Sequence, residues 1–149
     1  MSKTYSDYDW VEEGLSVGAA PADASEVGPE FDVVIDLRPD QEAYVIGLWR
    51  AGKQGYRLPF NDPGVLPPVP DILAILDIAV HYLREGKSIL VHCQGGISRS
   101  PLVTAMILTR RDRQPLRETM QKVKEKHDVA NVNPVLWAQA EAMFGMRDL

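Results

Sequence analysis

The stretch that decides the fold is SILVHCQGGISRSPLVTAMILT, residues 88–109. Its first five residues, 88–92, are mostly apolar and predict a fully buried strand. Residues 100–109 are apolar again, with Pro101 in the first turn, where proline is tolerated, and predict a helix. Between them lie a cysteine, two adjacent glycines and an arginine. This order predicts a β-loop-α unit whose loop follows the carboxyl end of a strand, where open α/β sheets bind their ligands.

The sequence on both sides continues the alternation of strands and helices. Strands are predicted at residues 14–18, 31–37 and 55–59, and helices at 41–51, 116–127 and 134–144. A further helix has Asp71 as its N-cap and Gly86 just beyond its end, because the apolar residues between them recur at helical spacing. We therefore predict an α/β protein with a mostly parallel central sheet of about four to five strands, flanked by helices.

Length, composition and charge limit the kinds of protein that this chain can be. The chain has 149 residues, 45% of them hydrophobic and 25% charged, which fits a single domain over residues 1–149. The formal net charge is −5 and no basic run reaches five residues, which argues against nucleic acid as a partner. The densest basic run, from Arg110 to Arg113, is typical of a solvated helix end, with a docking patch as the alternative.

The sequence also bears on location and cofactors. No secretory segment begins the sequence and no apolar stretch approaches the roughly 20 residues of a membrane span, so we expect a cytoplasmic protein without membrane contact. We expect it to act as a monomer. The single cysteine, Cys93, excludes an internal disulfide. The three histidines lack ligand spacing, so we predict no metal and no cofactor.

The loop from Cys93 to Arg99 has the composition of an anion site. Adjacent glycines let the backbone curl with its N–H groups pointing inward, and a nest of amides at a helix N-terminus binds anions. The guanidinium of Arg99 can bind two phosphate oxygens at once. The predicted phosphate-binding residues are Gln94, Gly95, Gly96, Ile97, Ser98 and Arg99.

The same positive surroundings favour the thiolate of Cys93, the nucleophilic form of a thiol. Attack of this thiolate on phosphorus would give a phosphocysteine intermediate. Ser100 is expected to donate a hydrogen bond to the sulfur as it leaves, and His92 to orient the loop rather than act as a base. The alternative is that Cys93 is a small buried hydrophobic residue next to a glycine turn. The preceding strand and the ending Ser98-Arg99-Ser100 argue against that alternative.

The pattern His-Cys-x-x-Gly-x-x-Arg-Ser at residues 92–100 resembles the signature of the protein tyrosine phosphatase superfamily. Its ending, Ser98-Arg99-Ser100, resembles the dual-specificity branch. Residues 14–20 and 33–37 are similar to the first two strands of that branch, and residues 133–139 to the start of its last helix. The resemblance implies a small cysteine-based phosphatase fold, with a phosphorylated protein or peptide as substrate.

The resemblance also implies a general acid: an Asp on a loop about thirty residues before the cysteine, which would protonate the leaving oxygen and later activate water. Asp62, in the sequence Asn61-Asp62-Pro63-Gly64, stands at that place. An ordinary turn is the alternative for this tetrapeptide. Rival candidates for the acid are Asp36, Asp40 and Asp128.

Three other polar residues complete the set of candidates. Asn133 either hydrogen-bonds towards the signature loop, as the resemblance suggests, or caps the helix that begins at Pro134. His81 and His127 are expected on helix surfaces.

The variable positions of the loop bear on substrate. Gln94, Gly96 and Ile97 include no lysine, whereas relatives that act on phosphoinositides resemble this loop but place basic residues there. A neutral loop favours a single phosphate on a protein side chain, phosphotyrosine first, with phosphoserine and phosphothreonine left open. Two alternatives remain: a phosphate-binding module without catalysis, and a phosphatase for a non-protein ester such as a phosphoinositide. Sulfur transfer by a rhodanese-like enzyme ranks below these.

Overall fold

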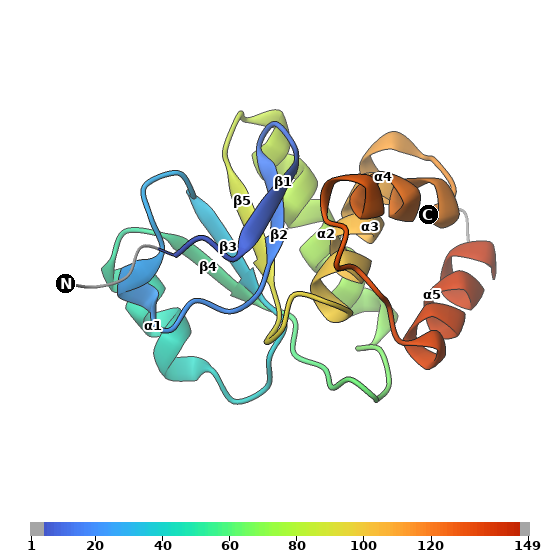
Figure 1. Ribbon diagram of the computed structural model, residues 1–149, viewed down its shortest axis with the longest axis horizontal. Coiled ribbons are helices and arrows are strands. Elements are labelled where there is room, and N and C mark those ends of the chain that lie inside the picture. Colours follow the sequence, from blue (N-terminus) through green and yellow to red (C-terminus); the bar gives the residue numbers. More distant parts are fainter. Residues whose placement is uncertain (1–4, 147–149) are drawn as a thin grey trace.

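A computed structural model describes residues 5–146 as one sheet with helices on both of its faces (Figure 1). The strands are β1 (Tyr8–Glu12), β2 (Leu15–Gly18), β3 (Val33–Asp36), β4 (Gln54–Arg57) and β5 (Ile89–His92). The helices are α1 (Glu42–Arg50), α2 (Val69–Arg84), α3 (Arg99–Asp112), α4 (Leu116–Lys126) and α5 (Pro134–Met146), with a short 3-10 helix, η1 (Ala24–Glu26).

The strands are ordered β1-β2-β5-β3-β4, and every neighbouring pair is parallel except β1 with β2. The prediction of a mostly parallel sheet of four to five strands is therefore confirmed. In the register of the sheet, His92 at the end of β5 pairs with Gly18 on one side and Asp36 on the other. Cys93 therefore leaves the sheet at the middle of its carboxyl edge.

The central strands are buried on both faces. In β5, Ile89 and Val91 pack into the larger core under α2, α3, α4 and α5, while Leu90 packs into the smaller core under α1. Figure 1 shows α1 on one side of the sheet and the other four helices on the opposite side. Burial on both faces explains why these strands are apolar without alternation. The loop after β5 is consequently attached to a strand whose four residues are all buried.

The structure differs from the sequence prediction at several element ends. Strand β1 was not predicted, because Asp9 and Trp10 are exposed at the sheet edge and leave no apolar alternation. Helix α2 begins at Val69 after Pro68, so the N-cap prediction for Asp71 is wrong; the fixed φ of proline suits the first turn of a helix. Gly86 does follow the end of α2, with φ +77°. Among the described residues, no helix is both long and apolar enough to cross a membrane.

Candidate active site

The loop between β5 and α3 requires a glycine at position 96. Gly96 has φ +72°, a backbone conformation that side chains disfavour. A Cβ there would also lie 2.7 Å from the backbone nitrogen of Ala19, whereas a Cβ on Gly95 would have no neighbour closer than 3.8 Å. Of the two adjacent glycines, only the second is therefore demanded by the geometry.

Donors from three other segments hold the outer side of this loop. The carbonyl of Gln94 accepts from the N–H of Ala20, at 3.1 Å, and the carbonyl of Ile97 from the N–H of Asn131, at 2.7 Å. The carbonyl of Gly96 accepts from His127 Nε2, at 2.6 Å. Because C=O and N–H point in opposite directions in a trans peptide, these bonds direct the next N–H groups inward.

The inward amides divide into two groups. Those of Gly95, Ile97 and Ser98 donate to no protein acceptor within residues 5–146. They are available to an anion, as predicted for a phosphate-binding nest. The amide of Gly96 is different, because it donates to Cys93 Sγ at 3.3 Å.

Cys93 is 2% exposed and lies at the floor of this nest. Its sulfur lies 3.3 Å from Ser100 Oγ, in the first turn of α3. In the arrangement found, the Ser100 hydroxyl donates to the carbonyl of Gly18, at 3.0 Å, and the thiol donates to Ser100 Oγ. A hydroxyl has one hydrogen, so Ser100 must turn it from Gly18 to the sulfur in order to stabilise a thiolate.

His92 is fully buried and its ring is held from both sides. Nε2 lies 2.8 Å from Tyr44 Oη, and Nδ1 lies 3.3 Å from the carbonyl of Cys93. Burial lowers the pKa of His92 to about 4, against a smaller opposite effect of Asp36. The neutral ring therefore donates from Nδ1 to the Cys93 carbonyl and accepts from Tyr44. These contacts are those of a residue that orients the loop, with Tyr44 of α1 as a partner that the sequence did not suggest.

His127 is also buried, at 4% exposure, so its predicted place on a helix surface is wrong. It follows α4, and its ring joins the loop to β1: Nε2 contacts the carbonyl of Gly96, and Nδ1 lies 2.7 Å from Asp9 Oδ2. Each ring nitrogen therefore faces an oxygen atom, one in β1 and one in the signature loop. A histidine at the end of an amphipathic helix carries no sequence signal for this role.

Arg99 connects the signature loop to the segment that contains Asp62. Its Nη1 donates to the carbonyl of Phe60, at 2.9 Å. Phe60 is buried, and its N–H donates to the carbonyl of Leu37 beyond β3. One donor of the guanidinium fork is thus engaged by the protein, and the side chain still lines the cavity above Cys93.

A cavity of about 460 Å³ opens above the nest, and Asp62, Cys93 and Arg99 all line it. None of the rival acids does. The carboxylate of Asp36 is buried and accepts three hydrogen bonds from Arg38. Asp40 lies in a turn with φ +57°, and Asp128 is exposed. Of the four candidate carboxylates, the structure therefore brings Asp62 alone to the cysteine.

Asn133 contacts the signature loop, but not through its side chain. Its backbone N–H donates to Ser98 Oγ, at 2.9 Å, while its side-chain oxygen accepts from the N–H of Val135 in the first turn of α5. The side chain therefore has the capping role, and the backbone makes the contact with the loop. Of the two alternatives for Asn133, each describes a different part of the residue.

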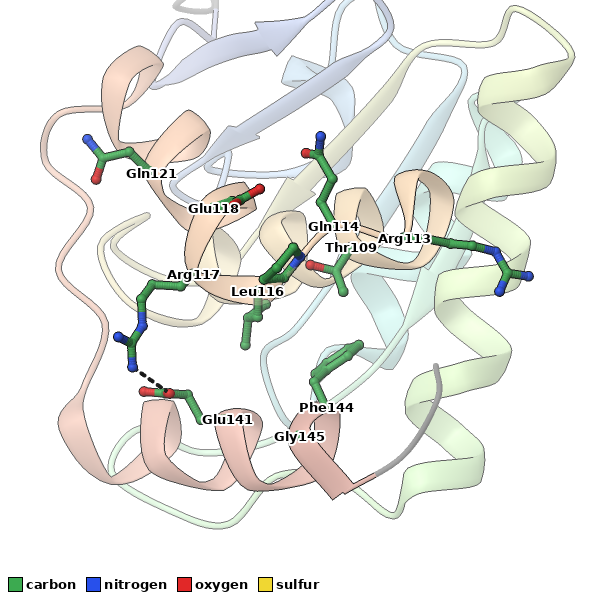
Figure 2. A pocket seen from close by; sticks show the side chains of 11 residues that line it. Thr109, Arg113, Gln114, Leu116, Arg117, Glu118, Gln121, Glu141, Phe144 and Gly145 are labelled. Carbon is green, nitrogen blue, oxygen red and sulfur yellow. Dashed lines mark hydrogen bonds and ion pairs between the residues drawn. The ribbon is translucent and has the colours of Figure 1, made fainter.

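No group of three His, Cys, Asp or Glu side chains in the described part of the chain is placed to hold a metal ion. A larger cavity, about 780 Å³, lies away from the cysteine, where α5 faces the junction of α3 and α4 (Figure 2). Phe144 and Leu116 line it, and Arg117 pairs with Glu141 at its rim. It contains none of the predicted site residues.

Comparison with known proteins agrees with this geometry. The family described as "Dual specificity phosphatase, catalytic domain" matches residues 19–143, which include the loop and Asp62. The human protein named "Dual specificity protein phosphatase 12" is 31% identical over 137 residues, covering 83% of this chain and 37% of that protein. The chain thus spans well under half the length of this relative.

Solved structures have a similar fold. Tk-PTP in its active form has a TM-score of 0.83 at 27% identity, covering 97% of this chain and 99% of that one. PTPMT1 in complex with PI(5)P has a TM-score of 0.82 at 18% identity, covering 95% of this chain and 96% of that one, a likeness of fold alone. The family match covers most of the chain, including residues 93–99 and Asp62. The chain belongs to the family of dual-specificity phosphatase catalytic domains, a family of hydrolases.

Proposed function

We propose that this protein hydrolyses phosphate monoesters on protein side chains, phosphotyrosine first, through a phosphocysteine intermediate. One observation carries the proposal: Cys93, Arg99 and Asp62 line a single cavity over a nest of inward amides. The three groups come from two distant segments of the chain, and each supplies a different requirement of phosphoryl transfer. They are a nucleophile, a cation for the phosphate oxygens and a carboxyl group for the leaving oxygen.

In the first step, the Cys93 thiolate attacks phosphorus while Arg99 and the amides bind the phosphate oxygens. The S–P bond forms as the bond from phosphorus to the leaving oxygen breaks. Asp62, as the neutral acid, gives its proton to that oxygen, which would otherwise leave as a poor alkoxide or phenoxide. Neutral His92 takes no proton and keeps the Cys93 peptide in place through its Nδ1–H.

In the second step, water attacks the phosphocysteine. The Asp62 carboxylate accepts the proton of that water, and the S–P bond breaks to release inorganic phosphate. The Ser100 hydroxyl, 3.3 Å from the sulfur, turns from the Gly18 carbonyl and donates to the departing thiolate. This returns the enzyme to its starting state.

The cavity walls support an aromatic phosphate ester carrying one phosphate. Among residues 5–146, Arg99 is the single Lys or Arg that lines it, so a second phosphate would meet no further cation from this part of the chain. Ile97, 49% exposed, together with Val132 and Pro134 forms an apolar rim. A phenyl ring can pack against such a rim, whereas a polyphosphorylated inositol ring would gain little from it.

The decisive experiment compares wild type with Cys93→Ser on p-nitrophenyl phosphate, without added metal and in the presence of a chelator. We expect turnover by the wild type, inhibition by vanadate and no turnover by the variant. Vanadate binding that persists without any turnover by the wild type would instead indicate a phosphate-binding module. Dependence on a divalent metal would refute the mechanism.

Substrate class is tested by phosphate release from matched phosphotyrosine and phosphoserine peptides and from a phosphoinositide panel. We expect the highest kcat/KM on phosphotyrosine. A higher value on any phosphoinositide would overturn the protein-substrate part of the proposal and leave the chemistry intact.

The acid is tested by Asp62→Ala. We expect vanadate inhibition to be unchanged, kcat on phenyl phosphate to fall by about 10²-fold or more, and the basic limb of the pH–rate profile to disappear. An unchanged profile would show that another group is the acid.

A further inference from the structure

The segment that carries Asp62 is attached to the protein at two places. On its amino-terminal side, Phe60 is held by Arg99 and by the carbonyl of Leu37. On its carboxyl-terminal side, Leu66 packs against the larger core, and the hydrogen bonds come from a single side chain, Gln139 of α5. Asp62 lies between these two anchors.

Gln139 uses both ends of its amide on this segment. Its Nε2 donates to the carbonyl of Gly64, at 3.0 Å, and its Oε1 accepts from the N–H of Leu66, at 2.8 Å. Within residues 5–146, these are the only hydrogen bonds from the protein to the backbone of residues 61–67. Val65, between the two bonded groups, is 77% exposed and contributes little packing of its own.

Helix α5 connects this anchor to the nucleophile loop. Leu136 and Ala140 are fully buried, so the helix is fixed against the core on either side of Gln139. At its start, the N–H of Asn133 donates to Ser98 Oγ in the signature loop. One rigid helix therefore touches both halves of the active site.

We propose that Gln139 is a positioning residue for the general acid: its amide holds residues 64–66 and thereby sets Asp62 over Cys93. The proposal rests on the proposed function, since it needs Asp62 to be the acid. Gln139 itself does not line the cavity and touches no reacting atom. Its loss should therefore impair protonation of the leaving group and spare phosphate binding.

The test uses leaving groups of different basicity, because a poor leaving group needs the acid and a good one does not. Gln139→Met keeps the length of the side chain and removes both hydrogen bonds. We expect kcat/KM on phenyl phosphate to fall about 10-fold or more and kcat/KM on 2,4-dinitrophenyl phosphate to change by less than about 3-fold, because kcat/KM reports the step in which the leaving group departs and not the later hydrolysis of the phosphocysteine. Vanadate inhibition should stay at the wild-type level. Glu141→Gln, on the same helix and paired with exposed Arg117, is the matched control and should change neither rate.

A double variant separates positioning from general damage to the fold. In the Asp62→Ala background, Gln139→Met should lower kcat/KM on phenyl phosphate no further, because the group that it positions is already gone. Gln139→Glu keeps the acceptor for Leu66 and loses the donor to Gly64, so its rate on phenyl phosphate should lie between those of the wild type and Gln139→Met. This variant also tests the proposal if Gln139→Met folds poorly. An equal loss on both leaving groups, or an additive loss in the double variant, overturns the proposal.

The result also separates this inference from the assignment of the acid. If Asp62→Ala is impaired on phenyl phosphate and Gln139→Met is not, only the role of Gln139 is wrong. If Asp62→Ala retains wild-type activity on phenyl phosphate, the acid assignment is wrong and the role of Gln139 falls with it.

Discussion

The contact between His127 and the nucleophile loop leads to a prediction for His127→Ala. The substitution removes a ring that is 4% exposed and leaves the carbonyl of Gly96 without its donor. An unsatisfied buried carbonyl costs about 1–3 kcal/mol. The lost pair with half-exposed Asp9 adds at most about 1 kcal/mol, because solvent screens it. We therefore expect the free energy of unfolding to fall by about 1–4 kcal/mol.

The same substitution should weaken anion binding. The carbonyl of Gly96 and the N–H of Ile97 belong to one peptide group, so a carbonyl without its partner lets that N–H turn away from the nest. Loss of one fixed donor to a developing anion costs about 10²–10³-fold in rate when the loss is complete. Partial loss of position should raise the vanadate inhibition constant about 10-fold.

Urea unfolding and vanadate inhibition measure the two effects, and two variants serve as controls. His127→Gln keeps an N–H that can reach the Gly96 carbonyl and should recover most of the vanadate affinity. Asp9→Asn keeps an acceptor for Nδ1 and should lower stability by less than about 1 kcal/mol. Wild-type values of both quantities in His127→Ala would refute the reasoning. A loss of stability with full vanadate affinity would refute the part that concerns Ile97.

Three further predictions concern the residues of the loop itself. Because burial lowers the pKa of His92 from 6.5 to about 4, the unfolded chain takes up a proton in this range that the folded chain does not. Acidification from pH 7 to pH 4 should therefore lower the free energy of unfolding by about 3 kcal/mol through this residue. Urea unfolding of His92→Asn over the same pH range should show a loss of stability that is smaller by about this amount. Gly96→Ala should cost about 1–3 kcal/mol and most of the activity, while Gly95→Ala stays near wild type in thermal melts and p-nitrophenyl phosphate turnover; equal effects would contradict the steric argument. Ser100→Ala should slow the second step and produce a pre-steady-state burst of p-nitrophenol, and its absence would count against a role in sulfur departure.

The parts of the site that could be predicted are those encoded within one continuous segment. Strand β5, the loop and the start of α3 occupy residues 88–109, so their composition alone indicates an anion site with a nucleophile. The central strands could be predicted equally well, because burial on both faces requires an unbroken run of apolar residues. Strand β1 was missed because an edge strand with exposed residues shows no such run.

The supports of the site could not be predicted because they join positions far apart in the sequence. His127 bonds to Gly96 across 31 positions and to Asp9 across 118. Gln139 bonds to Gly64 across 75. On a helix pattern, each of these polar residues is indistinguishable from one that faces water. Only the packing of α4 and α5 against the core turns them towards the two loops.

The choice among the acidic residues illustrates the same limit. Asp36 is the last residue of β3 and Asp62 follows β4, so topology alone places either carboxylate near the carboxyl edge of the sheet. Asp36 is removed from consideration by a local contact: Arg38, two residues later, binds both of its carboxylate oxygens. That ion pair lies within a tripeptide, so the pattern Asp-x-Arg at residues 36–38 is a local sequence signal against Asp36 as the acid.

In the proposed reaction two separate loops act at one phosphorus atom, and Arg99 and α5 connect these loops. The guanidinium that lines the phosphate cavity also binds the carbonyl of Phe60, and α5 bonds to Ser98 through Asn133 and to the acid segment through Gln139. A movement of the segment that carries Asp62 would therefore break the bond from Phe60 to Arg99, which belongs to the signature loop. It would also break the bonds to Gln139 of α5, the helix that follows Asn133. In the proposed mechanism, contacts on both sides of Asp62 therefore hold the proton donor in a fixed position relative to the attacking sulfur. A reaction that forms one bond to phosphorus while it breaks another requires such fixed positions.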